Sequence, residues 1–129
     1  MTSRVFTHEQ ASALLPEVRR ITDEHQRLLL ELRERQHERT GAQGAAAQRR
    51  THKLNDWINH IITQWSEAIT ALGALPKGLW TVDFDSGHGY YFCWTFDEET
   101  LSYFHRYDEG FIARKPLKDL DKEPPLLLS

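Results

Sequence analysis

The sequence predicts an α+β fold, in which a long antiparallel helical hairpin packs on a small antiparallel sheet of about three strands. Apolar residues recur every three or four positions over residues 14–32 and again over residues 54–72, which is typical of helices with one buried face. From residue 79 the apolar residues alternate, which is typical of strands. A chain of 129 residues can bury a real core, and we expect a single domain, 1–129.

The composition argues against several classes of protein, namely disulfide-rich, secreted, membrane-spanning and general nucleic-acid-binding proteins. The single cysteine, Cys93, argues against an internal disulfide framework and against a cysteine-based zinc site, and it suits a reducing compartment. The first residues show no signal peptide, and no apolar stretch approaches the roughly 20 residues that span a bilayer. We therefore expect a cytoplasmic protein without a membrane partner. The net charge of -3 argues against general nucleic-acid binding.

The first helix is expected to begin at Thr7, whose side chain can cap the free amides, with Gln10 where a capping box requires it. Pro16 lacks an amide proton and disfavours helix at the preceding residue. We therefore expect a short first helix or a kink, with Pro16 near the start of a longer helix. The positions on or beside the apolar stripe of that helix are Leu14, Val18, Ile21, His25, Leu28, Leu29, Leu30 and Leu32.

Residues 33–53 form a polar, basic stretch with Gly41 and Gly44 as helix breakers. Its cations are Arg33, Arg35, Arg39, Arg49, Arg50 and Lys53. We expect a solvated tip between two helices, with a loose turn at 40–44. The alternative is a basic surface for an acidic partner or a nucleic-acid backbone. Because no aromatic residue is interleaved with the cations, base stacking is not expected, and nucleic acid is not the partner we favour.

A return helix follows, and Gly73 is placed to end it. Its apolar stripe and flanking apolar positions are Leu54, Trp57, Ile58, Ile61, Ile62, Trp65, Ala68, Ile69 and Leu72. Two stripes of matching length favour an antiparallel hairpin over residues 1–73. His52, Asp56 and His60 share one face of this helix, but they make an incomplete ligand set, so no metal site is expected.

The segment 78–117 reads as a β-meander with a closing segment, and 118–129 as a surface tail. The expected strands and turns, in chain order, are 79–85, 86–89, 90–96, 97–99 and 101–107. Aromatic residues fall on both faces of the strands, so neither face is fully wet. The helices can cover one face, and the other needs the C-terminal segment, a second subunit or a ligand.

Short motifs spread along the chain resemble those of one family. They are Phe6-Thr7, Ala13-Leu14-Leu15-Pro16-Glu17-Val18, Gly78-Leu79, Val82-Asp83-Phe84 and Cys93-Trp94, followed by His105, Asp108, Gly110-Phe111, Arg114 and Pro116. Together they resemble the uncharacterised bacterial family catalogued as domain of unknown function 2203, over nearly the whole chain outside the basic tip and the tail. This chain has Phe104 where the family typically has tryptophan. The resemblance implies a helical hairpin with a small antiparallel sheet, and it implies no reaction.

The stretch 103–116 is the densest in groups that could do chemistry. The candidate ligand-binding residues are Asp83, Cys93, Trp94, His105, Asp108 and Arg114. A carboxylate beside an imidazole, here Asp83 and His105, raises its basicity, as a general base requires. Arg114 could clamp an anion. Cys93 could act as a nucleophile only beside a base that lowers its pKa.

The same residues also fit a purely structural network. Arg114 would then pair with Asp108 or Asp83, His105 would bond a backbone carbonyl, and Cys93 would be a small buried side chain. The outcome depends on strand register, which the sequence does not fix. No complete catalytic or cofactor motif occurs, so neither a catalytic residue nor a cofactor is assigned, and enzymatic activity stays open.

Two functions follow from these observations. We expect a non-enzymatic interaction or accessory protein that forms a homodimer, because the apolar positions exceed what one hairpin and one sheet can bury. The surplus lies at Leu29, Leu30, Trp57, Ile62 and the aromatic sheet. The alternative is a small-ligand or anion-binding domain, or a weak hydrolase, built on Asp83, His105, Asp108 and Arg114.

Overall fold

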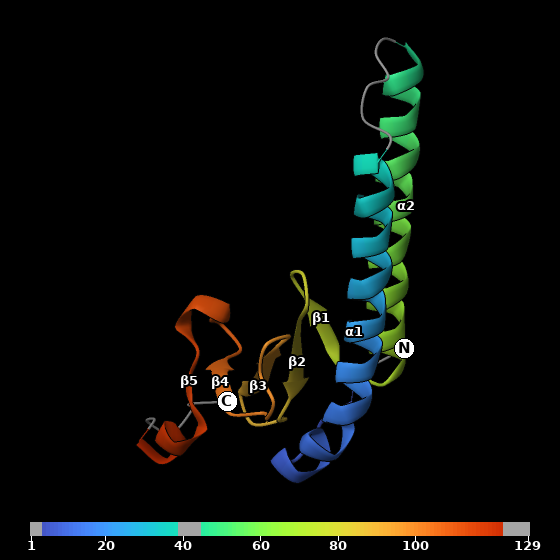
Figure 1. The fold of residues 1–129 in the computed structure, drawn as a ribbon. Coiled ribbons are helices and arrows are strands. Elements are labelled where there is room, and N and C mark those ends of the chain that lie inside the picture. Colours follow the sequence, from blue (N-terminus) through green and yellow to red (C-terminus); the bar gives the residue numbers. More distant parts are fainter. Residues whose placement is uncertain (1–3, 39–44, 123–129) are drawn as a thin grey trace.

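The computed structural model describes residues 4–38 and 45–122. A long pair of helices stands beside a small sheet, and the sheet lies against only the lower half of that pair (Figure 1). The expected turn at 40–44 and the tail from 123 onward lie outside the described residues. No helix in the described part of the chain is both long and apolar enough to cross a bilayer.

Helix α1 runs from His8 to Glu38 and begins as expected. The Gln10 amide donates to Thr7 Oγ1 over 3.0 Å, and the Thr7 amide donates to Gln10 Oε1 over 2.9 Å, so the capping box is confirmed. Pro16 lies inside the helix, which corrects the expectation of a separate first helix. Residues before and after Pro16 anchor the helix in the core, since Leu15 and Val18 are both buried, and this packing offsets the missing amide bond. The first turns of α1 lean away from the axis of the rest (Figure 1).

Helix α2, Ala45–Ala71, returns beside α1. Within the seam the Trp65 indole Nε1 donates to Thr22 Oγ1 over 2.9 Å, and both side chains are buried. Gly73 follows the helix with φ of 92°, the left-handed conformation predicted for it. The antiparallel hairpin is therefore present as expected.

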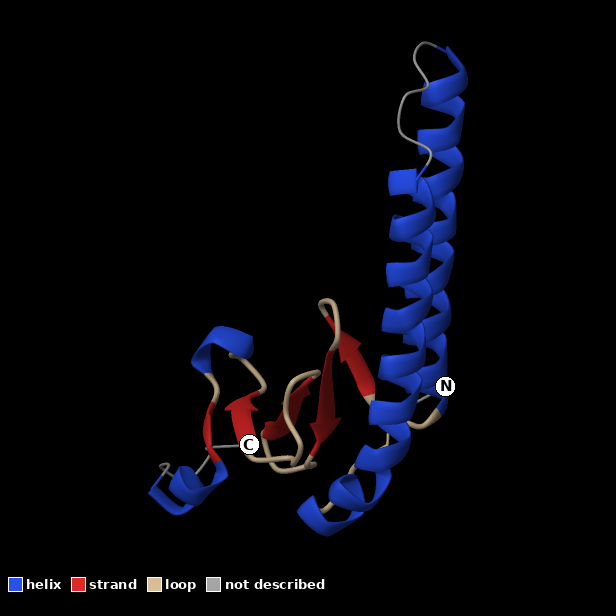
Figure 2. Cartoon of the chain, in the orientation of Figure 1, coloured by secondary structure: helices blue, strands red, loops and turns tan. Residues whose placement is uncertain are grey.

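The sheet has five strands rather than the expected three or so (Figure 2). In spatial order they are β1 (Leu75–Lys77), β2 (Thr81–Asp85), β3 (Tyr90–Thr95), β4 (Tyr103–Arg106) and β5 (Lys115–Pro116), each antiparallel to its neighbours. The two missed strands, β1 and β5, are the edges. Each is too short to show alternation and each contains a proline, which edge strands tolerate.

Two short 3₁₀ helices flank β5: η1 covers Phe111–Ala113 and η2 covers Leu117–Lys122. The second lies where only an irregular tail was expected. The described chain thus keeps regular structure to residue 122.

The two faces of the sheet differ in chemistry. One face is apolar and shares a single core with the helices; its buried side chains are Val82, Phe84, Phe92, Trp94 and Phe104. Since side chains alternate along a strand, Asp83, Cys93 and His105 lie on the opposite face. The register then decides which of these three residues meet. Asp83 faces Cys93 across β2 and β3, and His105 faces Tyr91 across β3 and β4.

Candidate functional site

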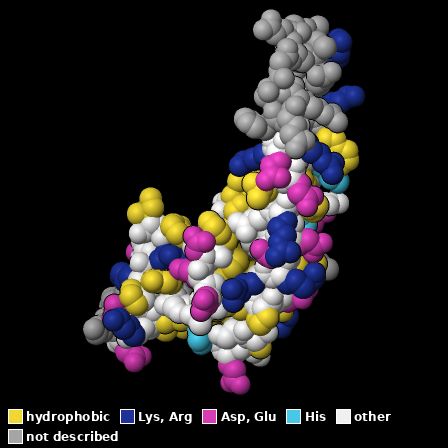
Figure 3. Space-filling model, viewed as in Figure 1, with side chains coloured by type: hydrophobic (Ala, Val, Ile, Leu, Met, Phe, Trp, Pro, Cys, Tyr) yellow, Lys and Arg dark blue, Asp and Glu magenta, His cyan; other side chains and the backbone are white. Residues whose placement is uncertain are grey.

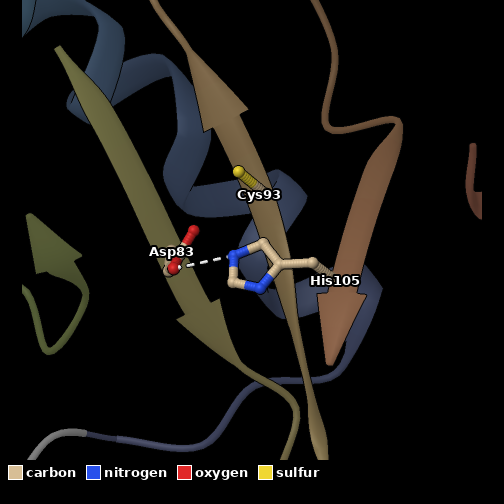
Figure 4. A group of neighbouring side chains, drawn as sticks. All are labelled: Asp83, Cys93 and His105. Atoms are coloured by element: carbon tan, nitrogen blue, oxygen red, sulfur yellow. Dashed lines mark hydrogen bonds and ion pairs between the residues drawn. The ribbon is translucent and has the colours of Figure 1, made fainter. Parts of the chain in front are cut away.

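Three neighbouring strands bring three polar groups together on the face of the sheet opposite the apolar core. Asp83 comes from β2, Cys93 from β3 and His105 from β4 (Figure 4). The His105 imidazole reaches back across β3, so that its Nε2 lies 3.0 Å from Asp83 Oδ2. Asp83 and His105 are only 2% and 4% exposed. The carboxylate–imidazole pair considered from the sequence is therefore formed, and it is buried.

The hydrogen bonds of His105 fix the position of one of its protons. Its Nδ1 lies 3.0 Å from the carbonyl oxygen of Arg106, which can only accept, so Nδ1 carries a proton. The contact between Nε2 and Asp83 needs one further proton, carried by the imidazole or by the carboxyl group. Burial raises the pKa of the Asp83 carboxyl, and the nearby His105 and Cys93 oppose that rise only in part. The pair thus shares one proton in a closed site.

The second carboxylate oxygen of Asp83 has no hydrogen-bond partner. Oδ1 is buried, and no group among the residues that the structure describes donates to it within hydrogen-bonding geometry. Figure 4 shows this oxygen on the side of Asp83 that points toward Cys93. An unpaired buried acceptor is costly, so this oxygen is the least satisfied group of the site.

Cys93 lies at the centre of the cluster and is fully buried. Burial raises the pKa of its thiol well above the ordinary value, and the adjacent Asp83 carboxylate raises it further, while Arg114 lowers it only in part. The thiol therefore stays protonated at neutral pH. In this arrangement Cys93 does not meet the condition that a nucleophilic cysteine requires.

Arg114 borders the cluster but is held by other groups. Its Nη1 lies 2.9 Å from Glu98 Oε1, and its guanidinium stacks 4.2 Å from the ring centre of Tyr103 and 4.3 Å from that of Phe111. Both side chains of the ion pair are largely buried. The expected partners Asp108 and Asp83 are thus replaced by Glu98, and the positive charge of Arg114 is compensated.

Two of the candidate residues lie outside the cluster. The side chain of Asp108 is 82% exposed and lies 3.9 Å from Arg106 Nε, a loose surface contact. Trp94 follows Cys93 in β3 and therefore points to the apolar core, where its Nε1 donates to the carbonyl oxygen of Glu98 over 2.8 Å. The cluster therefore comprises Asp83, Cys93 and His105, with Arg114 at its border.

Glu98 is the residue that sequence reasoning missed. Besides Arg114, its Oε1 accepts from the Thr95 amide over 2.9 Å, so it closes the turn after β3. The sequence shows only an acidic turn at 97–99, in which three adjacent carboxylates are equivalent. The one available signal is that Glu98 lies three residues after Thr95, a spacing at which a side chain can bond back to the backbone.

The comparisons with known proteins give one match. The sequence profile of a family described as an uncharacterized conserved protein (DUF2203) matches residues 4–117. Neither the curated proteins nor the solved structures contain a match to the chain. Since the family profile covers nearly all of the helical hairpin and the sheet, the chain belongs to the DUF2203 family.

Proposed function

We propose that this protein is a non-enzymatic interaction or accessory protein of the cytoplasm, and that it works as a homodimer joined through the free part of its helical hairpin. The observation that carries the proposal is the exposure of Trp57, the largest apolar side chain type, which is 58% exposed on α2. Contiguous exposed apolar side chains mark protein contacts, so the exposure of Trp57 counts together with the apolar side chains beside it.

The exposed tryptophan belongs to a small patch that spans both helices. Leu28 precedes the buried Leu29, and Trp57 precedes the partly buried Ile58. In an antiparallel pair, residues that precede seam positions fall on the same flank. The Thr22–Trp65 hydrogen bond fixes the axial register of the two antiparallel helices. Counting along each helix from that bond, Leu28 lies within about one helical turn of Trp57. We call Leu28 and Trp57 the flank patch.

The part of the hairpin that carries the flank patch stands clear of the sheet (Figure 1). Apolar side chains are visible there among charged ones (Figure 3). A pair of helices buries only the seam between them and leaves its other faces exposed to solvent. Two such hairpins can cover one of these faces on each other by forming a four-helix bundle. Covering the exposed part of one Trp57 removes roughly 130 Å² from water, which is worth about 3 kcal/mol.

A second copy of the chain is the occupant that the charges favour. The nearby charges of α1 pair within the helix: Arg20 with Glu17 and Glu24, and Arg27 with Asp23. These two arginines and three carboxylates carry a net charge of only −1, so charge repulsion between two identical faces is small. A two-fold axis needs this self-compatibility, because it brings the same patch of both copies together.

The buried cluster gives enzymatic function less support. The Cys93 thiol is protonated, both ring nitrogens of His105 are engaged, and Arg114 is compensated by Glu98. An anion-binding site or a weak hydrolase built on Asp83, His105, Asp108 and Arg114 would need those groups to converge and to reach solvent. We therefore keep the interaction function as the proposal.

Sedimentation velocity over a range of protein concentrations tests the proposal. Trp57→Glu should raise the dissociation constant of the dimer at least about a thousandfold, since two contacts worth about 2–3 kcal/mol each are lost. Leu30→Glu is the matched control, because Leu30, which the sequence grouped with the surplus apolar positions, is 57% exposed but lies about 200° around α1 from Leu28, outside the flank patch. It should leave the dissociation constant within about threefold. A monomeric wild type, or equal effects of both variants, would contradict the proposal.

A further inference from the structure

We propose that Asp83, Cys93 and His105 form a binding site for a divalent transition metal ion, with Zn²⁺ as the ion that fits best. One carboxylate oxygen, one thiol sulfur and one imidazole nitrogen lie within 4.8 Å of one another, and all three residues are buried. This inference is independent of the dimer, because the cluster lies in the sheet and the flank patch lies on the hairpin.

The spacing is close to what zinc requires. Tetrahedral zinc with bonds of about 2.0–2.3 Å separates its ligand atoms by roughly 3.3–3.8 Å. The ligand atoms of Asp83, Cys93 and His105 lie within 4.8 Å of one another, so their widest separation is slightly larger than the separation in a zinc site. Rotation of the carboxylate and of the thiol closes that difference without movement of the strands, whose pairing already sets Asp83 opposite Cys93.

The orientation of His105 matches that of a metal ligand. Its Nδ1 donates to the backbone carbonyl of Arg106 over 3.0 Å, which leaves Nε2 pointing into the cluster (Figure 4). Histidines that bind metals usually donate their other ring N–H to such a carbonyl, which fixes the tautomer and increases the basicity of the ligating nitrogen. The same bond to a backbone carbonyl was expected for a structural network, so the orientation permits metal ligation but does not by itself require it.

The unpaired oxygen of Asp83 is a second, independent observation. Oδ1 is a buried acceptor with no donor among the described residues, and it lies on the side of Cys93. A cation between Asp83, Cys93 and His105 would satisfy it. Without a cation, the group beside this oxygen is the weak thiol donor of Cys93, whose interaction with the Asp83 carboxyl opposes only in part the rise that burial causes in the pKa of that carboxyl.

Charge and donor type select the metal. A carboxylate, a thiolate and a neutral imidazole carry two negative charges, which a divalent ion neutralises in a buried site. Binding would release the thiol proton and the proton shared by Asp83 and His105. Mg²⁺ and Ca²⁺ prefer oxygen ligands alone, whereas a set of nitrogen, sulfur and oxygen suits Zn²⁺. Three protein ligands leave a fourth position for water or another ligand. The single cysteine of the chain excludes only the cysteine-rich kind of zinc site.

Co²⁺ is the probe for this site, because thiolate ligation produces a charge-transfer band in the near ultraviolet. We expect the chain of 129 residues, without a tag and freed of metal, to develop this band and to saturate at about one equivalent, and Zn²⁺ should displace the cobalt. The chain contains seven histidines, but binding to histidines alone gives no thiolate band. The band therefore reports ligation by Cys93.

Cys93→Ser keeps the size of the side chain and should abolish the thiolate band while the protein stays folded by circular dichroism. Asp108→Asn is the control and should leave the titration unchanged, because Asp108 lies outside the cluster. Zn²⁺ at about one hundred times its dissociation constant should raise the melting temperature of wild type by about 10 °C, and this rise should be lost in Cys93→Ser. A folded wild type without the band, or a band that persists in Cys93→Ser, would overturn the proposal.

Discussion

Removal of Asp83 is predicted to be among the most destabilising single changes on the polar face of the sheet. Asp83→Ala leaves His105 Nε2 without its partner at 3.0 Å, in a site where both residues are at most 4% exposed. Breaking a buried ion pair from one side costs about 3–5 kcal/mol. The free energy of unfolding of a native domain is about 5–15 kcal/mol in total, so this change removes a large part of the stability.

Urea unfolding at pH 7 in the presence of a chelator measures this cost without a contribution from bound metal. The midpoint for Asp83→Ala should fall by about 2 M, given a slope of about 1.5–2 kcal/mol per molar for a domain of this size. Asp83→Asn keeps the shape and offers an N–H to the imidazole, so its cost should be less than half as large. Asp108→Ala, on an exposed side chain, should cost under about 0.5 kcal/mol. If the free energies of unfolding of Asp83→Ala and Asp108→Ala differ by less than about 1 kcal/mol, the buried Asp83–His105 pair does not stabilise the sheet.

Three further predictions concern single contacts. The Cys93 thiol should react with iodoacetamide at least about a hundredfold more slowly in the folded chain than in urea, because its pKa is raised and it is buried; equal rates would contradict this. Thr22→Val should cost about 1–3 kcal/mol in urea unfolding, since the buried Trp65 N–H loses its acceptor; an unchanged midpoint would show that the bond contributes nothing. Arg114→Gln should cost about 1–3 kcal/mol by the same assay, and the loss should largely vanish in a Glu98→Gln background if the ion pair is its cause.

Local signals in the sequence predicted the helical half of the fold well. The capping box at Thr7 and Gln10 and the left-handed Gly73 each depend on a few adjacent residues, so their geometry follows from local chemistry. The hairpin follows from two apolar stripes of equal length. For Pro16 we expected a short first helix or a kink; it lies inside one continuous helix, because the packing of its neighbours outweighs a local preference, and the first turns of that helix lean away from the axis of the rest.

The edges of the sheet could not be predicted in the same way. β1 and β5 are held by pairing with the neighbouring strands β2 and β4 rather than by a pattern of their own. Trp80, just before β2, has φ of 64°, a conformation rare for a large side chain. Its buried ring packs edge-on against Trp65 at 5.1 Å, a tertiary contact with no trace in the local sequence.

Alternation predicted part of the cluster and missed its border. The sequence named Asp83, Cys93 and His105 as candidates on three neighbouring strands and left their meeting to the register, which shows that His105 reaches Asp83 across Cys93. The same alternation directs Trp94 to the core. The partner of Arg114 lies in a turn, where spatial position is set by the chain as a whole and adjacent carboxylates look alike.

The fluorescence of Trp57 tests the proposed dimer most directly. The other three of the four tryptophans are buried, so a change in emission with protein concentration reports the surroundings of Trp57. As the concentration rises from nanomolar to high micromolar, a blue shift is predicted as the second copy covers the indole, and Trp57→Phe should abolish it. Emission that keeps the spectrum of an exposed indole over the whole range would contradict dimerisation through this face of the hairpin.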